Sequence, residues 1–179
     1  MKRRLSLILL ITAICVLLTS CGGKTPTEPQ PSPTPYPTTD VTFHQLSFKA
    51  AGTWLKSESI SAYAPNERIR YSLGISPIDE LDAYACNENL AASYLNDSDY
   101  TKETVTLNGS VFTKCTRISK VASDVPPPTY DYTYVYIIQG TQCWYMISYT
   151  ENIITGNTSF VSFLPQFEES LKYDPSKPF

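Results

Sequence analysis

Few residues of this 179-residue sequence could carry out acid–base or nucleophilic catalysis. His44 is the one histidine, so neither a Ser-His-Asp nor a Cys-His arrangement can be built without it. Its neighbours Thr42 and Gln45 favour an exposed or hydrogen-bonded histidine over a general base. A glycosidase-like reaction needs only two carboxylates, but the sequence gives no way to choose a pair. We therefore predict that the protein is not an enzyme.

Metal binding is suggested only superficially, by Asp97, Asp99 and Glu103 in a loop that enters a strand. An EF-hand also needs an acidic or amide residue at its fifth position, glycine at its sixth and glutamate at its twelfth, and this loop lacks them. A solvated turn is the better interpretation. The sequence predicts no metal and no cofactor.

Five cysteines are present, and three of them, Cys86, Cys115 and Cys143, belong to the predicted globular domain. Three thiols allow at most one internal disulfide, whose connectivity cannot be deduced from the sequence. Three buried thiols that act as small apolar side chains are the commoner outcome. Their spacing lacks the close pairs typical of zinc or redox sites.

Tyrosines alternate along one predicted strand and therefore share one of its faces, while Val135 and Ile137 point to the other. They are Tyr130, Tyr132, Tyr134 and Tyr136, and we call them the tyrosine stripe. If a helix covers this face, the rings fill the core with their hydroxyls hydrogen-bonded, which is the favoured interpretation. If the face is open, the rings form a stacking surface for sugar or peptide.

The N-terminus has the pattern of an export signal. A positive head, Met1–Arg4, precedes fourteen almost unbroken apolar residues, Leu5–Leu18. A membrane span needs roughly 20 apolar residues, so this run indicates a signal peptide, residues 1–20, that is removed.

The tetrad Leu18-Thr19-Ser20-Cys21 resembles the lipobox of bacterial lipoproteins. The resemblance implies cleavage between Ser20 and Cys21, and a diacylglyceryl group, with fatty acids such as palmitate, on the Cys21 thiol. It also implies a cell-membrane protein anchored by lipid at the extracytoplasmic face.

Residues 21–40 form a predicted linker in which proline recurs at every second or third position from Pro26 to Pro37. As polyproline II at about 3.1 Å per residue, residues 22–40 would reach roughly 60 Å from the lipid. A spacer of that length suits a Gram-positive cell surface. Loss of Lys2, Arg3 and Arg4 with the signal leaves eleven basic and seventeen acidic residues, a net charge of −6. With no basic stripe, the mature chain is not expected to bind nucleic acid.

Residues 41–179 have the length of one domain. We predict a first strand near Phe43–Phe48 and a turn at Gly52 that tucks the Trp54 ring under a sheet. Turn residues between alternating segments predict three hairpins, with breaks at 64–67, Asn108-Gly109 and 139–141.

Two helices are predicted. Ser76-Pro77-Ile78-Asp79 has the features of a helix start, and apolar spacing continues the helix from Pro77 to about Leu95. A second amphipathic pattern runs from Phe160 to Leu171, and Pro165 should kink that helix or delay its start.

This order of elements resembles the Mog1/PsbP-like fold, which includes a photosystem II subunit, a Ran-binding protein and small bacterial lipoproteins. The resemblance implies an α+β domain in which an antiparallel sheet is flanked by helices, an α/β/α sandwich. It rests on Phe48–Trp54, Ile75–Tyr84, Leu107–Gly109, Tyr134–Ile138 and Phe163–Leu171. Members of such folds act as assembly factors, subunits or adaptors.

Three functions follow from these observations. The leading hypothesis is a lipid-anchored, non-catalytic binding or adaptor module for another envelope component. An alternative is the binding of cell-wall glycan or peptide by an exposed tyrosine stripe, and a distant third is a carboxylate-dependent wall hydrolase.

Overall fold

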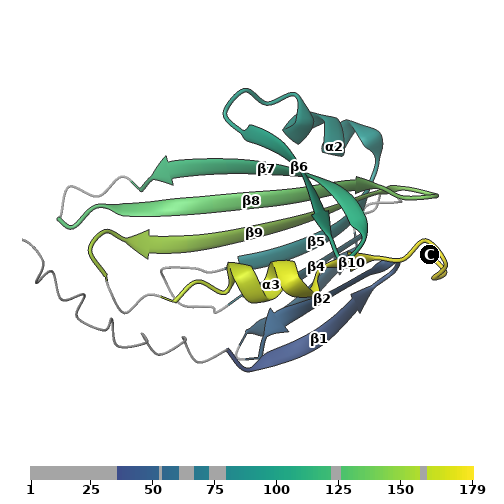
Figure 1. The fold of residues 1–179 in the computed structure, drawn as a ribbon, viewed down its shortest axis with the longest axis horizontal. Helices are drawn as coiled ribbons and strands as arrows, with labels where there is room; N and C mark the ends of the chain where they lie inside the picture. The colour runs from purple at the N-terminus through teal and green to yellow at the C-terminus, as the bar shows by residue number, and fades with distance from the viewer. Residues whose placement is uncertain (1–35, 53, 61–66, 73–79, 122–125, 158–160) are drawn as a thin grey trace, which may run out of the picture. The chain divides into compact units, whose positions relative to one another are not determined.

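The computed structural model describes residues 36–179 apart from residues 53, 61–66, 73–79, 122–125 and 158–160. This part of the chain is mostly antiparallel β-sheet with two helices (Figure 1). The predicted α+β class and the antiparallel sheet are therefore confirmed. Neither helix in the described ranges is long and apolar enough to cross a bilayer.

Within the described residues, the larger sheet has seven strands in the order β3-β4-β5-β9-β8-β7-β6. Every neighbouring pair in it is antiparallel. In chain order the strands are β3 (Leu55–Ile60), β4 (Glu67–Ser72), β5 (Glu80–Cys86), β6 (Thr101–Leu107), β7 (Ser110–Lys120), β8 (Thr129–Gln139) and β9 (Trp144–Ile154).

The three predicted hairpins are confirmed as β3–β4, β6–β7 and β8–β9. Asn108 and Gly109 both have positive φ, 48° and 80°, which is the backbone that a two-residue hairpin turn requires. The break between β3 and β4 lies outside the described residues, except for Glu67, which begins β4.

A second sheet joins the ends of the domain. It consists of β1 (Thr38–Phe43), β2 (Leu46–Ala51) and β10 (Lys172–Tyr173), with β2 in the middle. The single strand predicted near Phe43–Phe48 is thus wrong, because His44 adopts a positive φ of 51° and turns the chain into a hairpin. β1 also begins at Thr38, within the predicted linker.

The long helix predicted over Pro77–Leu95 is wrong for residues 80–86, which form β5. β5 lies between β4 and β9, where small side chains such as Ala83 and Ala85 are buried. Helix α2 (Glu88–Leu95) begins only at the N-cap Asn87, whose side chain accepts a hydrogen bond from the N–H of Leu90 at 3.0 Å. The predicted start at Ser76 lies outside the described residues.

The C-terminal helix is confirmed but short, since α3 spans Leu164–Ser170. Pro165 lies in its first turn, where a proline needs no N–H partner, so the proline delays the helix as predicted. Phe160 lies outside the described residues.

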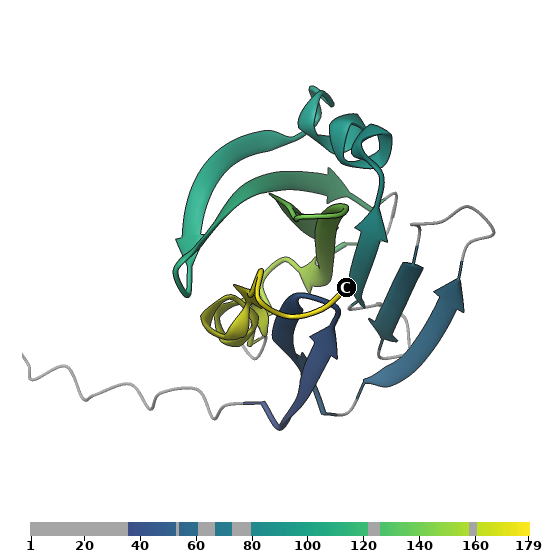
Figure 2. The same ribbon diagram turned by 90° about the vertical axis from the view of Figure 1, so that its right-hand side faces the viewer.

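The two helices lie on opposite faces of the seven-stranded sheet. Figure 2 shows α2 on the outer side of the curved sheet and α3, together with β1 and β2, on the inner side. The outer core gathers Cys86, Ala91, Cys115 and Met146. The larger inner core includes Trp54, whose ring stacks on Tyr149. The prediction that this ring packs under a sheet is confirmed.

Candidate functional site

The tyrosine stripe lies along β8 on the inner face of the sheet, and α3 closes one end of it. Tyr136 is 0% exposed, and its ring meets the ring of Phe167 edge-on at 5.4 Å between centroids. Its hydroxyl donates to Oε1 of Glu168 at 2.5 Å. Burial, followed by the contact with Glu168, raises the pKa of Tyr136, so this hydroxyl stays protonated.

Tyr134, the next tyrosine, is half-buried and stacks on Tyr149 with 6.2 Å between ring centroids. The ammonium of Lys114 lies 5.2 Å from the centroid of the Tyr134 ring and 2.8 Å from Oε1 of Glu168. Burial, and then the negative charge of Glu151, raise the pKa of Tyr134 to about 12. The middle of the stripe is therefore held in place by internal contacts.

Glu151 is a carboxylate on the same face, opposite Tyr132 on the neighbouring strand β9. It is 3% exposed. One of its oxygens, Oε2, accepts hydrogen bonds from the hydroxyl of Tyr149 at 3.0 Å and from Oγ of Ser162 at 2.6 Å. These bonds satisfy a buried acid and fix the chain just before α3 to the sheet.

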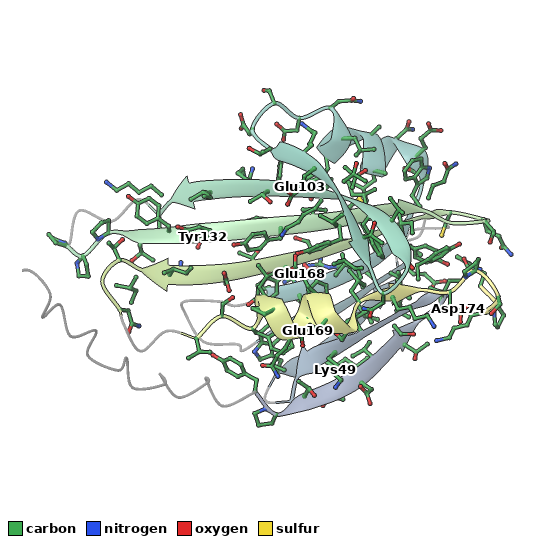
Figure 3. All side chains as sticks on the ribbon, in the orientation of Figure 1. Lys49, Glu103, Tyr132, Glu168, Glu169 and Asp174 are labelled. Carbon is green, nitrogen blue, oxygen red and sulfur yellow. The ribbon has the colours of Figure 1, made fainter. Side chains whose placement is uncertain are left out.

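The other end of the stripe is more open. Tyr130 and Tyr132 are half-buried, and Ile118, opposite Tyr132 on β7, is 57% exposed. Figure 3 shows Tyr132 on the stretch of β8 that extends beyond α3. The stripe thus changes along its length from core at Tyr136 to a partly exposed aromatic and aliphatic surface. We call Tyr130, Tyr132 and Ile118 the open end of the stripe.

His44 does not approach the stripe. Its Nε2 lies 2.7 Å from Oε2 of Glu67, and its ring stacks on Phe179 with 4.5 Å between centroids. This is the hydrogen-bonded histidine that the sequence favours, held in the turn between β1 and β2.

The acidic loop forms local bonds instead of a chelating group. The N–H of Asp99 donates to Oδ1 of Asp97 at 2.9 Å, and Glu103 extends to Lys114, with 3.8 Å between Oε1 and Nζ. Across the described ranges, no three His, Cys, Asp or Glu side chains come together as metal ligands.

Cys86, Cys115 and Cys143 are free and buried, as the interpretation of three buried thiols predicts. Burial, and then the proximity of Cys143, raise the pKa of the Cys86 thiol to about 12. Such a thiol is a poor nucleophile at neutral pH.

A charged cluster on the outer face is not predicted by the sequence patterns. Asp82 of β5 accepts hydrogen bonds from both Arg68 and Arg70 of β4, at 2.8 to 3.3 Å. The Arg68 guanidinium also lies 5.3 Å from the centroid of the Tyr84 ring. The alternation Arg68-Ile69-Arg70 indicates that the two arginines share a face, but their acidic partner falls in the segment predicted to be helical.

Ser20 and Cys21 lie outside the described residues, so their predicted roles in cleavage and lipidation stay predictions.

Comparisons with known proteins show little similarity. No protein-family model matches the chain, and no curated protein matches it. One similar solved structure is a crystal structure of a protein from Bacteroides thetaiotaomicron, with 11% sequence identity and a TM-score of 0.44. The similarity covers 74% of this chain and 46% of that one, so the chain spans less than half the length of the protein it matches.

Proposed function

We propose that this chain is a lipid-anchored extracytoplasmic lipoprotein whose domain is a non-catalytic binding module for another envelope component. The observation that carries the binding role is the change from a buried to a partly exposed surface between the two ends of the stripe. Tyr136 is fully buried, whereas Tyr132 is half-buried beside Ile118, which is 57% exposed. Apolar and aromatic side chains that a fold leaves exposed together are typical of interaction sites. We assign the contact with the partner to this open end of the stripe.

The Mog1/PsbP-like fold, an α/β/α sandwich, is part of this proposal. It is supported by an antiparallel sheet that carries α2 on one face and α3 on the other. β5 lies where the resemblance implies the start of a helix, so this segment does not support the Mog1/PsbP-like fold. A non-catalytic role agrees with the acids near the stripe, because Glu168 is paired with Lys114 and Glu151 accepts bonds from hydroxyls.

The binding role is tested with the full chain in detergent micelles, incubated with envelope proteins and separately with purified peptidoglycan. We expect Tyr132→Ala to weaken capture of the partner about tenfold, as the loss of an aromatic anchor does. Val111→Ala is the matched control, since Val111 is 58% exposed but lies off the stripe, near the β6–β7 turn.

Capture of an envelope protein that depends on Tyr132 supports the adaptor role. Glycan retention that depends on Tyr132 would instead support the alternative of wall binding. Release of soluble sugar or peptide from the peptidoglycan would contradict both and favour the hydrolase. Equal capture by Tyr132→Ala and the unchanged chain would remove the stripe from the proposal.

Lipid anchoring is tested separately by Cys21→Ser. The variant should stay unacylated and move from the membrane fraction to the soluble fraction. Two or more acyl chains attach a protein stably to a membrane, and the variant would carry none. Labelling with radioactive palmitate and membrane fractionation measure this. If the variant partitions with membranes as fully as the unchanged chain, the anchor is not on Cys21.

A further inference from the structure

The open end of the stripe borders a section of sheet edge that β6 does not cover. β6 begins at Thr101, which lies opposite Thr116 of β7. Among the described residues, Arg117–Lys120 of β7 are therefore paired on one side only, with β8. Figure 1 shows β7 and β8 running on past the start of β6.

This edge, which no strand of the described ranges covers, presents backbone hydrogen-bonding groups. The N–H of Val121 donates to the carbonyl of Thr129, the residue that begins β8, at 2.9 Å. Since such bonds alternate along an antiparallel strand, the N–H and C=O groups of Ile118 and Lys120 point away from β8. They face the line that β6 would occupy if it were longer.

Contacts on the outer face explain why β6 starts late. Tyr100, the residue before β6, is buried against Tyr94 of α2, with 5.6 Å between ring centroids. The guanidinium of Arg117 lies 4.9 Å from the centroid of the Tyr100 ring. These contacts hold the chain on the side of α2 until Thr101.

One side chain at this edge, Ile118, differs from those at the start of β6. The first four residues of β6, Thr101–Thr104, are exposed and polar or charged, as protected sheet edges usually are. On β7, by contrast, Ile118 is exposed next to the half-buried ring of Tyr132. A backbone edge and an apolar surface therefore lie side by side.

We propose that Arg117–Lys120 is a site of β-strand addition for an extended peptide segment of a partner protein. The peptide would pair with the backbone groups of Ile118 and Lys120 and would place a side chain beside Ile118, with Tyr132 one strand further in. This inference rests on the proposed function and deepens it, because a row of peptide N–H and C=O groups is matched by another polypeptide backbone. The partner at the open end is then a polypeptide and not a glycan.

The test uses peptides that are selected for binding to the full chain in detergent micelles. They come from a displayed library of random linear peptides. Ile118→Pro removes an outward N–H without removing a bond between β7 and β8, a position where strands tolerate proline. We expect this variant to weaken peptide binding about tenfold, since the edge loses a hydrogen bond and the ring of the introduced proline blocks strand pairing. Thr104→Pro is the matched control, because Thr104 is opposite Thr113 and its N–H points outward from β6. It should change affinity by less than about twofold.

Two further measurements keep the test decisive if Ile118→Pro folds poorly. Ile118→Lys keeps the backbone groups but puts a charge on the edge, so it should weaken the same peptides. Hydrogen exchange of the unchanged chain should show that the amides of Ile118 and Lys120 become protected when a peptide is bound.

Recovery of no binding peptide, or peptides that bind folded Ile118→Pro and Ile118→Lys normally, would overturn strand addition. If glycan is then still retained in a manner that depends on Tyr132, the binding role of the stripe survives while the peptide inference fails. If peptides protect the edge but Tyr132→Ala leaves partner capture unchanged, the assignment of the stripe fails instead.

Discussion

Asp82→Ala is expected to destabilise the domain by about 3 kcal/mol, because it removes the common partner of two arginines. The side chain of Asp82 is 9% exposed, while those of Arg68 and Arg70 are 30% and 37% exposed. Removing the acid leaves two like charges two residues apart on one face of β4. The two arginine side chains are about one-third exposed, so the loss should lie at the low end for a buried ion pair.

Urea denaturation of the full chain in detergent, followed by tryptophan fluorescence, measures this loss. Glu80→Ala is the control, because Glu80 contacts one of these two arginines at a longer distance, with 3.6 Å between its Oε2 and Nη2 of Arg70. Its loss should cost less than about 1 kcal/mol. Equal costs for Asp82→Ala and Glu80→Ala would mean that solvent alone satisfies the arginines.

The hairpins could be predicted because their signals are local. Asn108-Gly109 tolerates positive φ at both turn positions, and the alternation of side chains on each side fixes which residues share a face. The same alternation is sufficient to place the four tyrosines together on one face of β8.

β5 could not be predicted because its identity depends on its neighbours. Leu81 and Ala85 recur at a spacing that also fits a helix, and Pro77 adds a helix-start signal. In the sheet, β4 and β9 flank this segment and both of its faces are buried, so tertiary pairing overrides local preference. With β5 assigned to a helix, the contact between Asp82 and the arginines of β4 could not be anticipated.

The exposure of the tyrosine stripe was only half predictable. Sequence alternation shows that the rings share a face, but it does not show where α3 crosses that face. The position of α3 depends on Phe167, and it divides the stripe into a core end and an open end.

Phe167 is the main apolar contact between α3 and the sheets. It is 0% exposed, and its ring lies 5.4 Å from Tyr136, 6.0 Å from Tyr149 and 6.1 Å from Phe48, measured between centroids. A helix of seven residues is too short to be stable alone, so this packing holds it in place.

Phe167→Ala should therefore lower the free energy of unfolding by about 3–5 kcal/mol, through lost burial and the cavity left between three rings. In a domain of this size the melting temperature should fall by roughly 10 °C. Glu169→Ala on the same helix is the matched control, because Glu169 is exposed, and its effect should stay within about 0.5 kcal/mol.

Since α3 closes the stripe over Tyr136, the Phe167 variant should also expose that ring to tyrosine-modifying reagents below the melting temperature. Unchanged reactivity together with the full loss of stability would show that α3 stays docked without Phe167, and that the open and closed ends of the stripe are set by other contacts.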